Sequence, residues 1–477
     1  MNQALLLGST LLLLPAACMV GPDYQRPTVV LPEGWRELDG SQGESLANLP
    51  WWQLFQDPVL HELVRAALQQ NKDLQVAVER IEEARARYGF TRADLFPTLD
   101  AAAFAGRERV SGETPAGAAL GSDLERSYYG LGASLTWELD LFGRIRRASE
   151  AERALLYAAE QTRRAVVLAL VAEVARAYIE LRDLDRRLEI SRATLVSRRE
   201  YRELVRVRFE GGITSELDLR QAEGEVHRTA SQVHDLERQV GQKENELNLL
   251  LGRNPGPIPR GQTPAAMALP PRVPAGLPAQ LLERRPDLRA AEEQLVSANA
   301  RIGEAKALLY PTISITGFLG FESEDLGDLL GAPARSWSIG GNLLQPIFNA
   351  GRNTSRVEVA ESQQRQALFR YEQSILQAFR EVEDGLIAYR KTGERRTEEG
   401  GRVAAERQVL ALAELRYRGD VAPYLDVLDA QRQLFDAELN EAVAVRDQWL
   451  ALILLYRSLG GGWPTAPEPA EKAPDQG

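Results

Sequence analysis

The feature that most constrains the fold is an internal duplication. Three short sequence islands occur twice in the same order, at a spacing of about 208 residues, as Asp218 and Asp426 illustrate. The paired islands are 93–99 with 307–313, 141–144 with 347–352, and 208–218 with 416–426. Because a repeated unit of this size places its elements twice, the fold is expected to consist of two similar halves.

Each half contains long stretches with apolar residues at three- and four-residue spacing, which predicts amphipathic helices. The predicted helices cover 58–94, 144–208, 219–250, 279–309, 352–418 and 427–459. Stretches of about 65 residues are typical of coiled-coil hairpins and would run about 100 Å as helices. In each half the two shorter helices together match the long one, which predicts a tall bundle with turns at one end and strands at the other. Gly393, Gly400 and Gly401 predict a local break in the last long helix.

Two strand signals lie between the helices of each half. The predicted strands cover about 98–106, 128–141, 312–321 and 336–348. Apolar residues such as Leu135 and Trp137 alternate in them with polar residues such as Thr136. This alternation is typical of a membrane β-barrel, and also of a soluble sheet with one buried face. Because open edges are not tolerated in lipid, four strands in a membrane require further copies, and three copies supply twelve strands. The expected fold class is therefore α+β, with long helical hairpins and four strands per subunit of a trimeric barrel.

The N-terminus resembles a lipoprotein signal. The apolar stretch 4–14 and the small pair Ala16-Ala17 precede Cys18, the only cysteine of the chain. This order predicts cleavage that leaves Cys18 as a new N-terminus carrying diacylglycerol and an N-palmitoyl group. A signal peptide with an incidental cysteine is the alternative. Met19 stands where Asp commonly signals retention in the inner membrane, which favours the outer membrane.

These patterns divide the chain into six parts. The expected parts are a signal peptide at 1–17, an acylated N-terminal segment and equatorial region at 18–57, the first repeat at 58–253, a Pro/Gly-rich linker at 254–278, the second repeat at 279–463, and a disordered tail at 464–477.

The composition and motifs argue against an enzyme and against a nucleic-acid-binding protein. The net charge of −11 does not suit a nucleic-acid surface, which needs a basic stripe. The sequence contains no Cys/His cluster, no phosphate-binding glycine loop with lysine and no nucleophile elbow. His227 and His234 are seven residues apart on a predicted helix and are interpreted as surface residues rather than metal ligands. We therefore expect no catalytic residue, no metal site and no cofactor beyond the lipid on Cys18.

A series of short motifs extends over nearly the whole mature chain. These motifs are 18–27, Trp51-Trp52 with 55–58, 284–288, Tyr310-Pro311, Leu425 with 429–432, and 459–463. In this order they resemble the TolC/OprM family of outer-membrane factors, in the lipoprotein branch that serves resistance-nodulation-division (RND) pumps. The resemblance implies a homotrimer with a twelve-stranded barrel and a twelve-helix periplasmic tunnel. It also implies a passive exit duct in the outer membrane, working with a periplasmic adaptor (membrane fusion) protein and an inner-membrane RND transporter.

The resemblance places a periplasmic gate at the second helix-to-helix turn. Leu425, Asp429 and Arg432 match the stretch that forms the gate in the family. Asp426 and Asp429 are three residues apart, so they share one helix face and would form a six-carboxylate ring in a trimer. Such a ring repels itself, so Arg432 and Arg418 are expected to hold it shut. Without the resemblance, a carboxylate pair on a helix is more often an ordinary solvated face.

The resemblance also implies that the turns at 209–218 and 417–426 form periplasmic tips that contact the adaptor. The expected contact residues are Gly211, Gly212, Ser215, Leu217, Gly419 and Val421. Glycines permit the tight reversal between helices, so helix capping alone is an alternative reading of them. The family usually has a glycine where Asp420 stands, so the second tip is expected to close differently from the first.

Three other functions fit the sequence less well. A duct for type I protein secretion would differ only in its partners, and the lipid anchor favours efflux. A periplasmic coiled-coil adaptor would need a single hairpin and a soluble barrel domain, which the duplication disfavours. A glycosidase with paired carboxylates would show strands throughout, which these long helical stretches exclude.

Overall fold

The computed structural model describes residues 19–32, 34–36, 55–120, 124–267, 269, 278–419 and 421–461. The predictions for the signal peptide, Cys18, Asp420 and the tail 464–477 concern residues outside these ranges. The chain forms two compact units, each assembled from separate stretches of sequence. The strand unit comprises Met1–Thr28, Arg80–Glu160 and Ala290–Tyr371, and the helical unit comprises Val29–Glu79, Gln161–Arg289 and Glu372–Gly477.

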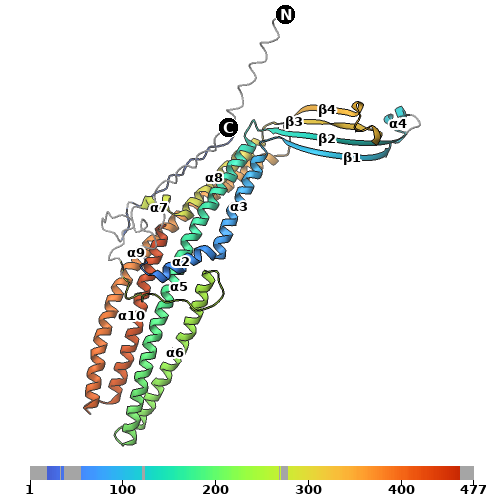
Figure 1. The fold of residues 1–477 in the computed structure, drawn as a ribbon. Coiled ribbons are helices and arrows are strands. Elements are labelled where there is room, and N and C mark those ends of the chain that lie inside the picture. The colour runs from blue at the N-terminus through green and yellow to red at the C-terminus, as the bar shows by residue number, and fades with distance from the viewer. Residues whose placement is uncertain are drawn as a thin grey trace. The chain divides into compact units, whose positions relative to one another are not determined.

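The elements follow one another twice in a similar order (Figure 1). The first half contains α2 (Pro58–Gln70), α3 (Lys72–Ala93), β1 (Thr98–Arg109), the short α4 (Pro115–Leu120), β2 (Glu125–Leu139), α5 (Arg144–Glu210) and α6 (Glu216–Leu250). The second half contains α7 (Pro278–Arg284), α8 (Pro286–Ala307), β3 (Thr312–Ser323), β4 (Arg335–Leu344), α9 (Arg352–Arg418) and α10 (Tyr424–Ser458). Two 3₁₀ turns, Leu326–Asp328 and Ala332–Ala334, lie between β3 and β4.

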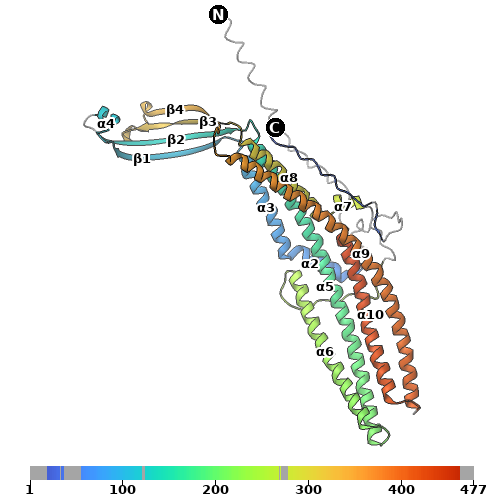
Figure 2. The same cartoon turned by 180° about the vertical axis from the view of Figure 1, so that it is seen from behind.

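The duplication is visible in the lengths of equivalent helices. Helices α5 and α9 each contain 67 residues, α6 and α10 each contain 35, and α3 and α8 each contain 22. In the helical unit, α5 runs beside α6 and α9 beside α10, as the two opposite views show (Figures 1 and 2). The predicted long helices and the predicted duplication are confirmed.

Two predicted helices are each divided in the structure, so those predictions were wrong in detail. The helix predicted at 58–94 ends at Asn71, whose side chain accepts a hydrogen bond from the Leu74 amide (3.0 Å) and donates one to the Leu250 carbonyl (2.9 Å). The helix predicted at 279–309 is divided before Pro286. Proline cannot donate an amide hydrogen bond and disfavours a helical conformation in the preceding residue, so a new helix begins there.

The break predicted within 352–418 was also wrong, because α9 is continuous. Glycines in α9 permit close contact with α10. A Cβ atom on Gly385 would lie 3.3 Å from the Leu455 Cα, and one on Gly393 would lie 2.9 Å from the Gln448 Nε2. The cost of a glycine in a helix is only about 1 kcal/mol. Packing against the neighbouring helix therefore outweighs it.

The core of the helical unit is formed by the middle of α5 and the C-terminal part of α10. The largest buried side chains include Trp449, Tyr178 and Leu181, none of which is more than 1% exposed. Burial of side chains of this size contributes about 1.5–3 kcal/mol each. The Trp449 indole donates to the Pro264 carbonyl (3.0 Å), so the polar group of this side chain is also satisfied.

The four strands of the strand unit form one antiparallel sheet in the order β1-β2-β3-β4. The strand predictions are confirmed apart from their ends, of which the largest difference is at β4. This strand stops at Leu344, because Gln345 is followed by Pro346, which cannot donate to a strand ladder. In the described ranges, β1 and β4 each pair on one side only, so both are edge strands.

The two faces of the sheet differ in polarity. One face carries exposed apolar side chains from all four strands, namely Leu99, Leu131, Leu319, Trp337, Ile339 and Leu343. The other face carries mainly glycine, serine and threonine. The register places Gly132 opposite Gly320, and Gly320 opposite Ser336, on this polar face.

The N-terminal segment of the strand unit is held against the start of α5. The Val20 amide donates to the Phe142 carbonyl (3.1 Å), and the buried Arg147 guanidinium bonds to the Asp23 carboxylate (2.8 Å). Gly21 has a φ of +97°, and a Cβ atom on it would lie 2.4 Å from the Cα of Gly303. Glycine is therefore required at both positions of this close contact.

Candidate functional site

The first helix-to-helix turn joins α5 to α6 and is stabilised at both ends. Gly212 has a φ of +71°, a conformation that glycine adopts without strain, and the Ile213 amide donates to the Arg208 carbonyl (2.8 Å). Ser215 caps α6 in a reciprocal arrangement with Asp218. Burial raises the pKa of Asp218, but hydrogen bonds from Thr214 and Ser215 outweigh it and hold this pKa below its usual value.

The second turn joins α9 to α10 and has a different cap. The Gly419 amide donates to the Leu415 carbonyl (3.1 Å), and the Val421 amide donates to the Arg416 carbonyl (2.9 Å). Pro423 occupies the N-cap of α10 without a side-chain cap hydrogen bond. The two turns are thus closed by similar backbone bonds at the ends of α5 and α9, but only the first has a polar cap on the following helix.

A cluster of aromatic rings lies just behind the two turns. Tyr417 and Tyr424 are buried, with ring centroids 5.7 Å apart, and the guanidinium carbon of Arg208 lies 4.8 Å from the centroid of the Tyr417 ring. Burial raises the pKa of Tyr424 to about 12, so its hydroxyl stays protonated at neutral pH. A hollow of about 480 Å³ is lined by both turns, including Gly212, Tyr417 and Tyr424. The tips therefore share one packed base and one surface hollow.

The predicted contact residues of the tips are exposed. Gly211, Gly212, Ser215, Leu217, Gly419 and Val421 all lie at the surface of the helical unit. Leu217 and Val421 are large apolar side chains, 65% and 71% exposed. An exposed apolar side chain on each turn is the kind of feature that a partner helix buries.

The structure brings the three predicted gate residues of early α10 onto one exposed surface. Leu425 is 53% exposed, and Asp426 and Asp429 are exposed one turn apart. Within the described ranges neither carboxylate forms an ion pair. Arg418 is exposed and lies 3.6 Å from the Glu414 carboxylate, one turn earlier on α9.

Arg432 contacts a residue that the sequence reasoning missed. Its guanidinium is paired with the carboxylate of Glu225 on α6 (Nη2–Oε1, 2.6 Å). Glu225 is only 4% exposed and also pairs with Arg198 on α5 (Nη1–Oε2, 2.8 Å), which is equally buried. Burial lowers the pKa of Arg198 despite the nearby carboxylate of Glu225. In one subunit, Arg432 therefore links α10 to the α5–α6 hairpin rather than to the carboxylates of its own helix.

A sequence signal for Glu225 does exist. It lies three residues after Ala222 and four before Thr229, both buried, so it belongs to the core-facing stripe of α6. A glutamate in such a stripe requires a cationic partner, because an unpaired buried charge is costly. Which arginine supplies it is not visible in the sequence, since Arg432 is 207 residues away.

The other residues considered for chemistry are isolated from one another. Within the described residues, no group of three or more His, Cys, Asp or Glu side chains is arranged to hold a metal ion. His227 is exposed, and His234 is exposed next to Glu237 (Nδ1–Oε2, 3.3 Å). Among the helices that the structure describes, none is long and apolar enough to cross a bilayer.

Comparisons with known proteins agree with this geometry. The sequence matches the family model of outer membrane efflux proteins over residues 63–253 and 277–461, one match for each half. The toluene efflux pump outer membrane protein TtgI of Pseudomonas putida is 39% identical over 95% of this chain and 97% of its own length. Outer membrane protein OprJ of Pseudomonas aeruginosa is 38% identical, with 97% and 95% of the two chains covered.

Solved structures show the same fold. The outer-membrane channel OprN has a TM-score of 0.85 at 34% identity, covering 94% of this chain and all of that one. The open state of the Neisseria gonorrhoeae MtrE outer membrane channel has a TM-score of 0.84 at 31% identity, with 93% and 98% covered. The duplicated helices, the amphipathic sheet and these matches lead to one conclusion: the chain belongs to the outer membrane efflux protein family.

Proposed function

We propose that this chain is the outer-membrane exit duct of a tripartite efflux system, working as a homotrimer that passively conducts small molecules from the periplasmic pump and adaptor to the exterior. The observation that carries the proposal is the sheet of the strand unit. Among the residues that the structure describes, its two edge strands, β1 and β4, each lack a partner on one side. Three copies joined edge to edge give twelve strands, an even number within the range of outer-membrane barrels.

The polarity of the sheet supports a position in lipid. Trp337 and Ile339 are 71% and 75% exposed on the apolar face. Leaving such side chains in water costs about 1.5–3 kcal/mol each, and acyl chains would remove this cost. The glycine, serine and threonine side of the sheet would then line a water-filled lumen.

The exposed carboxylates of α10 support a gate at the tips. Under threefold symmetry, Asp426 and Asp429 form the six-carboxylate ring expected from the sequence. Because Arg432 is already paired with Glu225 inside the subunit, Arg418 of an adjacent copy is the better candidate for holding the ring shut. The hollow between the turns, with Leu217 and Val421 exposed nearby, supports docking of an adaptor hairpin on the same tips.

Single-channel recording in planar bilayers tests the gate. The double variant Asp426→Ala/Asp429→Ala is expected to raise the conductance, because the ring and its cationic partners no longer hold the tips together. Asp384→Ala removes an exposed carboxylate of α9 that is far from the turn in sequence, and should leave the conductance unchanged. Equal conductance of the double variant and the wild type would contradict the gate assignment.

The proposal also includes an acylated Cys18, an adaptor and an inner-membrane RND transporter. Cys18→Ser should abolish incorporation of labelled palmitate, whereas unchanged labelling would remove the anchor from the proposal. The relatives are named as components of efflux pumps, which favours efflux over type I protein secretion. Restoration of solvent or drug efflux in a strain lacking its own outer-membrane component tests this choice.

A further inference from the structure

Two aromatic rings cover glycines reciprocally near the β1–β2 connection of the sheet. The Phe104 ring of β1 occupies the space above Gly130 of β2, where a Cβ atom would lie 2.2 Å from the Phe104 Cζ. The Tyr128 ring of β2 occupies the space above Gly106 of β1 in the same way, at 2.3 Å. The ring centroids are 6.1 Å apart, with an angle of 51° between the ring planes. The two rings therefore form one aromatic platform, which lies on the backbone of two glycines that have no side chain of their own.

The platform lies on the polar face of the sheet, where exposed aromatic side chains are not expected. The register places Phe104 opposite Gly130, and Gly130 opposite Glu322, on the same face as Gly132 and Gly320. One side of each ring covers the backbone of a glycine on the neighbouring strand. Phe104 and Tyr128 nevertheless remain 45% and 41% exposed. A substantial part of the platform is thus open toward the space above the polar face.

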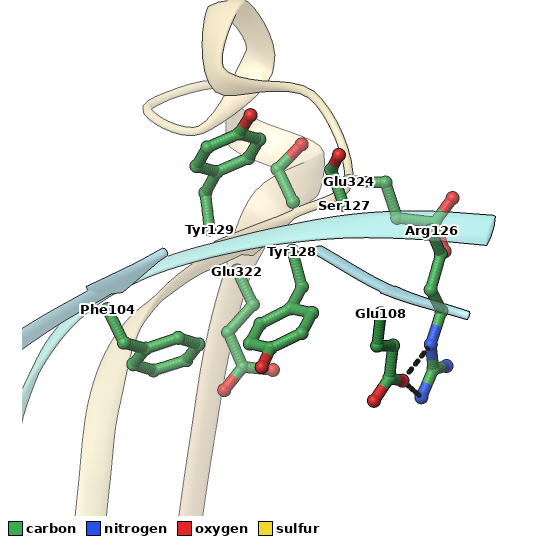
Figure 3. A pocket seen from close by; sticks show the side chains of 9 residues that line it. Phe104, Glu108, Arg126, Ser127, Tyr128, Tyr129, Glu322 and Glu324 are labelled. Carbon is green, nitrogen blue, oxygen red and sulfur yellow. Dashed lines mark hydrogen bonds and ion pairs between the residues drawn. The ribbon is translucent and has the colours of Figure 1, made fainter. Parts of the chain in front are cut away.

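Two carboxylates, Glu108 and Glu322, lie beside the platform on the same face of the sheet. Figure 3 shows Phe104, Tyr128, Glu108, Arg126 and Glu322 on one side of the strands, and Tyr129 on the other. Glu108 is paired with Arg126 (2.5 Å). Glu322 is exposed, and no ion pair to it occurs within the described residues. The charge left beside the rings is therefore negative.

The platform and these carboxylates line a hollow of about 530 Å³. This volume is within the range of small-molecule sites. Aromatic faces attract cations through the ring quadrupole, and a carboxylate adds a direct charge interaction. An anion would be repelled by Glu322, and a neutral aromatic molecule would gain nothing from it.

We propose that this hollow is a transit subsite for aromatic ammonium compounds, which bind with the cation between the platform and Glu322. The proposal rests on the proposed function, because the polar face must line the lumen for cargo to reach the hollow. An exposed platform with a single free carboxylate gives weak binding, in the millimolar range, as transit requires. The subsite would enrich organic cations near the end of the duct without trapping them.

The test compares a cation with its uncharged analogue. Benzyltrimethylammonium and neopentylbenzene have nearly the same shape, and saturation-transfer NMR measures the binding of each to the full-length protein in detergent. Wild type is expected to bind the cation and to bind the neutral analogue at least fivefold more weakly. Glu322→Gln should weaken cation binding about fivefold, as expected for loss of a charge about 4 Å away in water. Tyr128→Leu should weaken it as well.

Two control variants change the opposite face of the sheet. Glu125→Gln alters a carboxylate there that is paired with Arg107, and Trp337→Leu removes a ring that does not line the hollow. Both should bind the cation like the wild type. Equal affinity for the cation and the neutral analogue, or an unchanged affinity of Glu322→Gln, would overturn the proposal. Neither result would contradict the proposed duct. The duct is tested separately by the conductance of small ions, which should be unchanged in every variant.

Discussion

Glu225→Ala is the substitution with the largest effect expected at the tips. In the wild type one carboxylate compensates Arg198, which is 4% exposed, and Arg432, which is 37% exposed. Removing one partner of a buried ion pair costs about 3–5 kcal/mol, because the remaining charge stays buried without compensation. Most of this cost falls on Arg198. Arg432 can turn to water, and a surface pair contributes only about 0–1 kcal/mol.

This cost should appear as faster opening of the tip helices. Each 1.4 kcal/mol corresponds to a factor of ten, so amide hydrogen exchange in α6 and α10 near Glu225 and Arg432 should accelerate roughly 10²-fold or more. Hydrogen-exchange mass spectrometry of the detergent-solubilised protein measures this directly. The amides of the sheet provide an internal reference that should not change.

Glu223→Ala is the matched control for this experiment. Glu223 lies on the same helix, two residues earlier, and pairs with Arg220 (2.9 Å) at the surface, where the Glu223 side chain is 37% exposed. Its loss should accelerate exchange less than about fivefold. If Glu225→Ala accelerates exchange no more than Glu223→Ala does, the reasoning about the buried pair is refuted.

Four further substitutions concern the contact of the N-terminal segment, helix α3 and the first turn. Gly303→Ala should destabilise the strand unit by about 1–3 kcal/mol in thermal unfolding, since the new Cβ would lie 2.7 Å from the Val20 carbonyl oxygen. Gly89→Ala has open space around the Cβ and should stabilise its helix instead. Ser215→Ala should cost about 1 kcal/mol through loss of the α6 cap, seen as faster hydrogen exchange in the first turn of α6. The lowered pKa of Asp218 means that its stabilisation is present above the unfolded pKa of about 3.9 and is lost as the pH falls through the lower folded value. In the wild type, hydrogen exchange in the first turn of α6 should therefore lose protection as the pH falls through this range. Asp218→Asn should remove this pH dependence, and an unchanged pH dependence would contradict the assignment.

The sequence predicted the long helices and the strands well, because each depends on a local period. Apolar spacing recurs along α5 and α9, which each contain 67 residues, and apolar residues alternate with glycine or polar residues over 129–139 of β2. The breaks were harder to predict. Asn71 ends a helix through a hydrogen bond to the Leu250 carbonyl, 179 residues away, and no local pattern reports such a contact.

The positions of the candidate site residues were predicted from the sequence, but their ion-pair partners were not. Asp426 and Asp429 lie on one exposed surface as their spacing indicated. Arg432 was expected to serve these carboxylates, yet in the subunit it pairs with Glu225 of a different hairpin. The aromatic platform was also missed, because Phe104 and Gly130 come together only through the register of β1 and β2. Contacts between distant segments set both features.

The central claim is that three copies of the four-stranded sheet close one barrel. Native mass spectrometry of the mature protein released from detergent micelles tests it most directly. The account predicts a complex of three chains after release, from a protein that needs detergent or lipid to stay dispersed in solution beforehand. A monomer that remains folded and dispersed in water without detergent would contradict it.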